Sequence, residues 1–152
     1  MINVKNGDIT FYHPDFVIHK NIDRTSMENI ISNMIIRQSQ TDTGYYYDYC
    51  WCDLEKDHKI YTSFCFYHNR LYEINLYPQH HFVDHSMSPS CSDCNVDWEL
   101  VKKWYNKYFH ADYLQFNWGE IRFIRGNDPI YAPTRIRIRY SREIPVEPDF
   151  VV

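Results

Sequence analysis

Residues 71–77, Leu-Tyr-Glu-Ile-Asn-Leu-Tyr, constrain the fold of this chain most strongly. Side chains alternate between the two faces of a β-strand, so Tyr72, Ile74 and Leu76 share one face. Glu73 and Asn75 share the other. An apolar face backed by a polar one is typical of an antiparallel sheet that packs against a core on one side only. The segment therefore predicts a sheet with one buried face and one wet face.

Further strands are predicted from short alternating runs bounded by turn residues. Residues 7–20 indicate two short strands around the turn His13-Pro14-Asp15. A short connection at residues 68–70 indicates a hairpin between strands 59–67 and 71–77, and Pro78 ends the second of them. The remaining strands are expected at residues 43–53, 119–125 and 134–140.

The clearest helix signal begins at Thr25. Thr25-Ser-Met-Glu28 fits a capping box, in which the Thr25 hydroxyl and the Glu28 carboxylate satisfy free backbone donors. An apolar stripe at helical spacing follows, made by Met27, Ile30, Ile31, Met34 and Ile35. We expect Ile30, Ile31 and Met34 to pack into the core.

A second helix is expected at residues 96–109, after a long loop at 79–95. Asn95 or Asp97 would cap it, and its apolar stripe comprises Trp98, Val101, Trp104 or Tyr105, and Tyr108. The predicted fold is α+β, with a single antiparallel sheet of six or seven strands and two helices packed on one face. Residues 1–142 form one domain, which suits a chain of 152 residues, and residues 143–152, with Pro145 and Pro148, form an extended tail.

Composition narrows the class of protein. Aromatic residues make up 18% of the chain, with 14 tyrosines, so rings must build either the core or an exposed face. The net charge of −4 argues against a general nucleic-acid binder. There is no apolar run of membrane-spanning length and no signal-peptide pattern, and the five cysteines are an odd number. These features predict a cytoplasmic protein with reduced thiols and no membrane partner.

One loop carries residues that bind zinc in other proteins. His80, His81 and His85 precede a Cys-x-x-Cys pair formed by Cys91 and Cys94. Thiolate and imidazole ligands suit zinc, but strong zinc motifs contain two separated ligand pairs, and the histidines here follow no such spacing. A polar surface loop with free thiols is the favoured interpretation, so we expect no cofactor and no stoichiometric zinc.

An arginine series follows near the end of the chain. Strand alternation places Arg135, Arg137 and Arg139 on one face, and Arg122 joins them if the two last strands pair. These residues could form a docking surface for an acidic partner. Alternatively, they pair with carboxylates across the strands, and the candidates are Glu73, Glu120 and Asp48. Reversal of Arg137 to Glu would separate the two: it slows association in the first case and unfolds the chain in the second.

The run 44–52 is dense in rings. Tyr45, Tyr47, Tyr49 and Trp51 would share one face of a strand, with Tyr46 and Asp48 on the other. Two such faces cannot both be buried beneath one layer of helices. Tyr and Trp are enriched in the cores of protein interfaces, which favours an interface, whereas a core strand with wet hydroxyls is the alternative.

Catalytic motifs are absent from the sequence. It contains no glycine-rich phosphate loop, no Gly-x-Ser-x-Gly and no His-Glu-x-x-His. The cysteines and histidines show no spacing that singles out a nucleophile and its base. No catalytic residue is therefore assigned.

The order of elements supports a resemblance. Residues 66–78, the segment Trp118-Gly119-Glu-Ile and the segment Ile136-Arg-Ile-Arg-Tyr140 resemble those of small uncharacterised α+β proteins of commensal bacteria, which end in a Trp-Gly-x-Ile/Val strand and an Ile-x-Ile-x-Tyr strand. Such proteins are suspected to be immunity proteins for secreted toxins. The resemblance implies no functional residue.

Together these observations favour a non-enzymatic protein-binding module, an immunity-type inhibitor of a bacterial toxin. A zinc-dependent or nucleic-acid-modifying enzyme built on the loop from His80 to Cys94 is one alternative, and a structural module is another. Binding is expected on the open face of the sheet, through Arg122, Arg135, Arg137, Arg139, Tyr45, Tyr47 and Tyr49.

Overall fold

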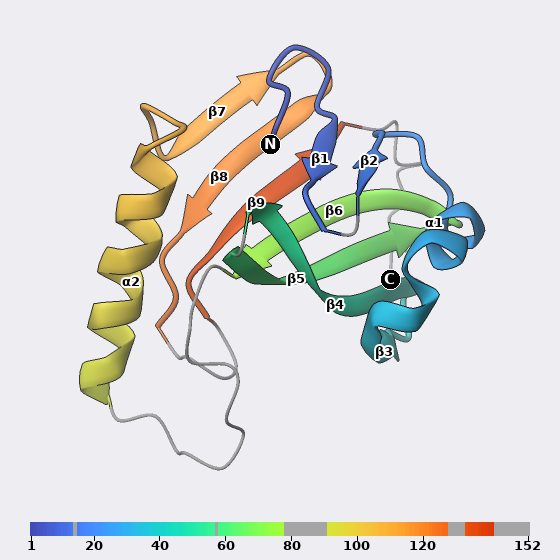
Figure 1. Cartoon of the computed structure of the whole chain (residues 1–152), viewed down its shortest axis with the longest axis horizontal. Helices are drawn as coiled ribbons and strands as arrows, with labels where there is room; N and C mark the ends of the chain where they lie inside the picture. The colour runs from blue at the N-terminus through green and yellow to red at the C-terminus, as the bar shows by residue number, and fades with distance from the viewer. Residues whose placement is uncertain (14, 57, 78–90, 128–132, 142–152) are drawn as a thin grey trace, which may run out of the picture.

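A seven-stranded antiparallel sheet dominates the computed structural model (Figure 1). It describes residues 1–13, 15–56, 58–77, 91–127 and 133–141, and only the backbone of residues 58, 59, 91–97 and 100. The strand order is β3-β4-β5-β6-β9-β8-β7, and β1 and β2 form a separate two-stranded sheet. The strands are β1 (Ile9–Phe11), β2 (Phe16–Ile18), β3 (Ile35–Gln40), β4 (Tyr45–Glu55), β5 (His58–Tyr67), β6 (Arg70–Tyr77), β7 (Tyr113–Phe116), β8 (Gly119–Ile124) and β9 (Arg135–Tyr140).

One face of the large sheet is covered by the other elements, and we call it the covered face. Helix α1 (Arg24–Ile31) lies beside β3 and β4, and helix α2 (Cys91–Asn106) lies beside β7 and β8, with the β1–β2 hairpin between them (Figure 1). Phe11 of the hairpin packs edge-on against Phe64 of β5, with ring centroids 6.1 Å apart. Tyr105 of α2 packs against Phe123 of β8 at 5.5 Å. We call the opposite side the open face.

The expected class is confirmed, but the expectation of a single sheet is not. The N-terminal hairpin does not extend the large sheet along an edge. It lies across the covered face and contacts β4 through one antiparallel bridge, His13 to Asp53. Its side chains Ile9, Phe11 and Ile18 are fully buried, so apolar burial places it over the sheet. Both helices cover the same face, as predicted. The expected tail, residues 143–152, lies outside the described residues.

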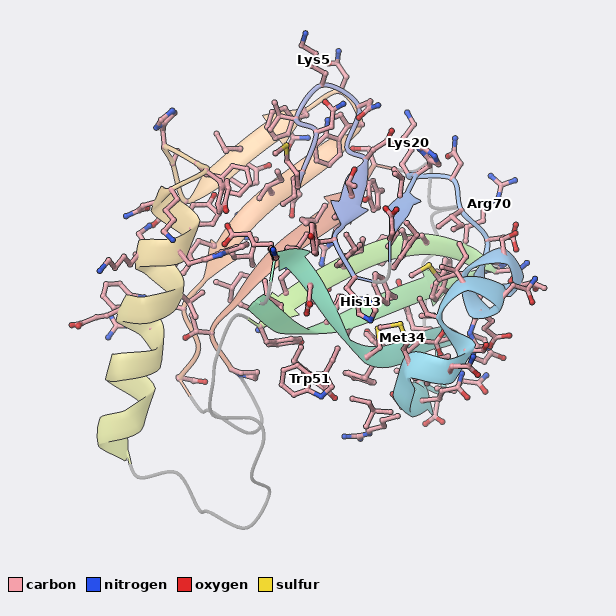
Figure 2. The ribbon with its side chains drawn as sticks, in the orientation of Figure 1. Lys5, His13, Lys20, Met34, Trp51 and Arg70 are labelled. Atoms are coloured by element: carbon pink, nitrogen blue, oxygen red, sulfur yellow. The ribbon has the colours of Figure 1, made fainter. Side chains whose placement is uncertain are left out.

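Helix α1 exists, but its cap differs from the prediction. Asp23, not Thr25, is the N-cap, and its carboxylate accepts a hydrogen bond of 2.8 Å from the backbone N–H of Ser26. Of the three residues expected in the core, Ile31 is fully buried, Met34 packs against the core from the side (Figure 2), and Ile30 is 42% exposed. The helix ends at Ile31, and Ile35 begins β3. This strand was not predicted, because Met34 and Ile35 continue the helical spacing of apolar residues.

Helix α2 also begins earlier than predicted. Its first residue is Cys91. Asn95 and Asp97, the two residues predicted to cap the helix, therefore lie within it. Val101 and Tyr105 are fully buried and Trp104 nearly so, whereas Tyr108 is 43% exposed. The stripe is therefore correct at its centre and wrong at its C-terminal end. Most of the expected loop, residues 78–90, lies outside the described residues.

The β5–β6 hairpin is confirmed, with one change in the faces of its strands. His68 and Asn69 form the turn with φ of 48° and 62°, the backbone of a two-residue turn that follows the sheet twist. The register shifts between Cys65 and Phe66, so β6 carries a bulge. Tyr72 therefore lies on the open face, close to Tyr45, and not on the covered face with Ile74 as predicted.

Trp118 and Tyr140 anchor the N-terminal segment to the β8–β9 side of the sheet. The Trp118 indole N–H donates to the carbonyl of Val4 at 2.9 Å, and the Tyr140 hydroxyl donates to the carbonyl of Gly7 at 2.9 Å. A Cβ at Gly119 would lie 2.1 Å from the carbonyl oxygen of Arg139, so no larger residue fits between β8 and β9. The resemblance motifs are thus explained by packing.

Candidate functional site

The open face is organised as rows of side chains that cross the strands. Register pairing aligns one residue from each strand in a row that spans the whole sheet. In order from β3 to β7, the row is Arg37, Tyr49, Ser63, Asn75, Arg137, Arg122 and Tyr113. The next row runs parallel to it, and comprises Ser39, Tyr47, Cys65, Glu73, Arg139, Glu120 and Gln115. Rings thus lie toward β4, and charges toward β8.

Tyrosines and one tryptophan cover β4, β5 and β6. We call this set the ring field: Tyr45, Tyr47, Tyr49, Trp51, Tyr61, Tyr67, Tyr72 and Tyr77. Each of these rings contacts at least one other, and Tyr49 stacks on Tyr61 with centroids 5.9 Å apart. Tyr45 stacks on Tyr67 at 4.6 Å. Trp51 projects from β4 on the side away from the β1–β2 hairpin (Figure 2). Each ring is partly exposed.

The surroundings raise the pKa of four tyrosines of the ring field. Burial raises the pKa of Tyr47, Tyr61 and Tyr77 above the ordinary value for tyrosine. The same cause raises the pKa of Tyr45, with the nearby Tyr72 adding to it. These four hydroxyls therefore stay protonated at neutral pH and act as hydrogen-bond donors.

Short polar side chains lie between the rings and the arginines. Ser63, Cys65, Asn75 and Glu73 are all at most 9% exposed. Asn75 donates to one oxygen of Glu73 at 2.8 Å, and Arg139 donates to the other oxygen from two nitrogens, at 2.8 and 3.0 Å. Glu73 therefore has both carboxylate oxygens occupied by partners on its own face.

Ion pairs hold two of the predicted arginines. Arg137 donates to Glu120 at 2.8 Å, and its Nε lies 3.9 Å from Glu73, too far for a hydrogen bond. Arg139 pairs with Glu73. The alternative of cross-strand pairing thus holds for these two residues. Asp48 takes no part in it, because it faces the covered side, where it is fully buried and accepts from Arg24 and Gln38.

The remaining arginines of the open face carry charge without a carboxylate partner among the described residues. The Arg37 guanidinium lies 5.5 Å from the centre of the Tyr49 ring, and that of Arg122 lies 4.8 Å from the Tyr113 ring. Arg135 donates to two neutral acceptors, Asn75 at 3.1 Å and the carbonyl of Pro133 at 3.3 Å. In the rows and their flank, five arginines (37, 122, 135, 137 and 139) face two glutamates (73 and 120), so the net charge is 5 − 2 = +3, opposite in sign to the chain's −4.

The thiols that the structure describes are not set up as nucleophiles. Cys50, Cys52 and Cys65 are free and buried. Burial raises the pKa of the Cys65 thiol to about 12, although the neighbouring Tyr47 hydroxyl lowers it. The pKa of Cys52 is raised by its hydrogen bond with Cys50 and by burial. Thiols with raised pKa values react slowly at neutral pH.

The predicted zinc cluster falls mainly outside the described part of the chain. His80, His81 and His85 lie there entirely, and Cys91 and Cys94 are placed only as backbone at the start of α2. Among the described residues, no group of three or more His, Cys, Asp or Glu could hold a metal ion. The expectation of no stoichiometric zinc stays a prediction.

Sequence reasoning found half of the ring field. Tyr45, Tyr47, Tyr49 and Trp51 share one face, as predicted, but the rings from β5 and β6 and the guanidinium of Arg37 were missed. The hairpin at residues 59–77 already carried the needed signal. Its alternation puts Tyr61 and Tyr67 on the same side as Ser63, opposite the apolar Phe64.

Comparison with protein-family models, with curated proteins and with solved structures found no match. In the part of the chain that the structure describes, neither helix has the length and apolar character needed to cross a bilayer.

Proposed function

We propose that this chain is a non-enzymatic binding protein that contacts a protein partner through its open face, and that the partner is a bacterial toxin that it inhibits. The observation that supports binding most directly is the ring field, which lies on the face over which none of the described helices or strands packs. The toxin as partner follows from the resemblance of the strand motifs.

The composition of the open face favours a protein interface. Tyrosine, tryptophan and arginine dominate the residues whose truncation costs most affinity in protein complexes. Here they lie together, since Arg37 covers Tyr49 and Arg139 covers Tyr72 at 5.4 Å. These rings are also held by their neighbours, so little side-chain entropy remains to be lost on binding.

The orientation of the rings favours a protein over single-stranded nucleic acid. Bases bind by stacking on exposed ring faces. At the centre of the ring field the ring faces are turned toward other rings, because Tyr47, Tyr49 and Tyr61 stack successively with interplanar angles of 22° and 19°. A partner then meets the edges of these rings, which suit side chains and backbone carbonyls.

The carboxylates of the open face support a binding role as well. A general acid or base needs a carboxylate with a free oxygen near its substrate. Glu73 is occupied at both oxygens, and Glu120 accepts from Arg137. Their pairing stabilises the face on which a partner would dock.

Co-expression tests the proposal. The genes next to this chain's gene would be searched for a secreted toxin, the chain would be produced together with it, and growth and complex formation would be measured. We expect growth to be restored and hydrogen exchange to slow in β4, β5 and β6 of the complex. The double variant Tyr49→Ala, Tyr61→Ala removes two ring-field rings and would abolish protection.

The matched control is Tyr12→Ala, which removes a tyrosine that is 56% exposed outside the ring field. We expect it to protect as well as the parent chain. Equal loss of protection in both variants, or slowed exchange confined to α2, would contradict the proposed interface.

A further inference from the structure

We infer that the partner's contact segment is acidic and extended, and that its carboxylates bind at Arg37 on β3 and Arg135 on β9, the strands on either side of the ring field. This inference rests on the proposed function and adds to it the chemistry of the partner. It also reassigns the predicted arginines: Arg135 contacts the partner, whereas Arg137 and Arg139 hold the face together.

The arginines of the open face differ in the partners of their N–H donors. An arginine side chain carries five N–H donors. Within the part of the chain that the structure describes, Arg135 uses two of them, and both go to neutral oxygens, so its charge is not paired with a carboxylate there. Arg37 is exposed and its guanidinium lies over the ring of Tyr49, so that the guanidinium edge meets no carboxylate among the described residues. By contrast, Arg139 and Arg137 already bind carboxylates.

The open face has few hydrogen-bond acceptors to offer a partner. Hydroxyls and guanidiniums supply donors, whereas the strong acceptors, Glu73 and Glu120, are bound by arginines of the same face. A complementary surface must therefore bring acceptors and negative charge. Carboxylates provide both, and their hydrogen bonds with guanidinium are about twice as strong as neutral ones. The local charge of the face thus selects an acidic segment although the chain as a whole is acidic.

The distance between Arg37 and Arg135 suits an extended segment that crosses the strands. Arg37 lies on β3 and Arg135 on β9, four strand spacings apart, or about 19 Å. Both side chains lean inward, Arg37 over Tyr49 of β4 and Arg135 toward Asn75 of β6, which are two spacings or about 10 Å apart. Two acidic residues at positions i and i+4 of an extended segment lie about 13 Å apart and point to the same side. That spacing fits the interval between the two guanidiniums.

Arg122 is excluded by its position. It lies on β8, beyond the ion pairs of Arg137 and Arg139, and packs on Tyr113 at the opposite edge of the sheet. Like Arg37, it carries a charge with no carboxylate partner among the described residues. Unlike Arg37, it does not lie beside the ring field. This makes it the matched control.

The test uses the full chain and capped nine-residue peptides of alternating Thr and Val. One peptide carries Glu at positions i and i+4, a second carries two adjacent Glu residues, and a third carries Lys at i and i+4. Calorimetry at low salt measures binding. We expect the first peptide to bind and the third not to bind. Arg37→Gln and Arg135→Gln should each weaken binding about tenfold, the loss of one charge-assisted contact, and Arg122→Gln less than twofold.

Several results would overturn the inference. These are no binding of the i, i+4 peptide at about 1 mM, equal binding of the two acidic peptides, or an equal loss with Arg122→Gln. Binding of an oligothymidylate in place of the peptide would also overturn it. If the toxin complex forms but is unchanged by Arg37→Gln with Arg135→Gln, this inference fails while the proposed function stands. If no toxin complex forms, the proposed function fails, whatever the peptides do.

Discussion

The two faces of the seven-stranded sheet are built from alternate residues of the same strands, yet different forces hold them. On the covered face, Phe64, Ile74 and Ile138 are fully buried among apolar groups. On the open face, their neighbours Ser63 and Glu73 lie among rings and ion pairs. Apolar burial therefore determines the fold, whereas the open face is stabilised by contacts that leave donors and charge unused. The following substitutions test how separate these two roles are.

The largest effect is expected from a ring deleted on the covered face. Phe64→Ala leaves a cavity beside Phe11 and should lower the free energy of unfolding by about 3–5 kcal/mol. Tyr49→Ala on the open face loses ring contacts worth about 0.5–1.5 kcal/mol each and no buried core volume. Urea unfolding would measure both. Equal losses would show that the open face contributes to the core after all.

Two glycines separate steric contact from backbone strain. Gly7 and Gly44 have φ of 79° and 85°, so alanine at either costs about 1–2 kcal/mol of strain. A Cβ at Gly7 would lie 2.5 Å from the Trp118 ring, while nothing lies within 4 Å of one at Gly44. We expect Gly7→Ala to cost about 1–3 kcal/mol more than Gly44→Ala, because the ring must move. Thermal unfolding of the pair checks the difference, and indistinguishable melting would exclude a tight contact at Trp118.

The ion pairs of the open face predict a dependence on pH. Burial, the largest single cause, would raise the pKa of Glu120, but the hydrogen bond and charge of Arg137, together with Tyr113 and Arg139, hold the pKa below the ordinary value. A carboxylate whose pKa is lower in the folded chain adds stability above its unfolded pKa, and this stability is lost as the pH falls through the folded value. Arg137→Gln should therefore destabilise the chain by about 1–3 kcal/mol at pH 7 and flatten the fall below about pH 4.5.

Unfolding measured from pH 7 down to acid would test this expectation. Arg122→Gln is the control, because its guanidinium packs on Tyr113 and holds no carboxylate among the described residues. An unchanged acid slope in Arg137→Gln would mean that the Glu120 pair contributes nothing to stability.

The smallest effect concerns the cap of α1. Asp23→Ala removes the acceptor of the Ser26 N–H and should lower the melting temperature more than Thr25→Ala does. The same hydrogen bond lowers the pKa of Asp23, so its stabilising effect is present at neutral pH and is lost as the pH falls through that lowered value. A larger loss with Thr25→Ala would restore the capping box predicted from sequence.

Strand alternation allowed the sheet and half of the ring field to be predicted, because the period of two is set by backbone geometry. It failed where geometry departs from that period. The bulge opposite Cys65 moved Tyr72 to the open face. Apolar residues at 34 and 35 continued the helical spacing of α1, although Ile35 belongs to β3. Pairing of Arg137 with Glu120 depends on the order of β8 and β9, which no local pattern encodes.

The position of β9 has a consequence for synthesis. Strand β9, the last of the described strands, inserts between β6 and β8, so β7 and β8 cannot join the sheet until β9 is present. On the ribosome, β3 to β6 can pair as successive hairpins while the nascent chain emerges, but their β6 edge stays unpaired until β9 has been translated. The hydrogen bonds of Trp118 with Val4 and of Tyr140 with Gly7 can likewise form only after β8 and β9 have emerged. A message truncated before β9 would therefore release a chain with an open β6 edge, which is a substrate for chaperones, for proteases or for aggregation.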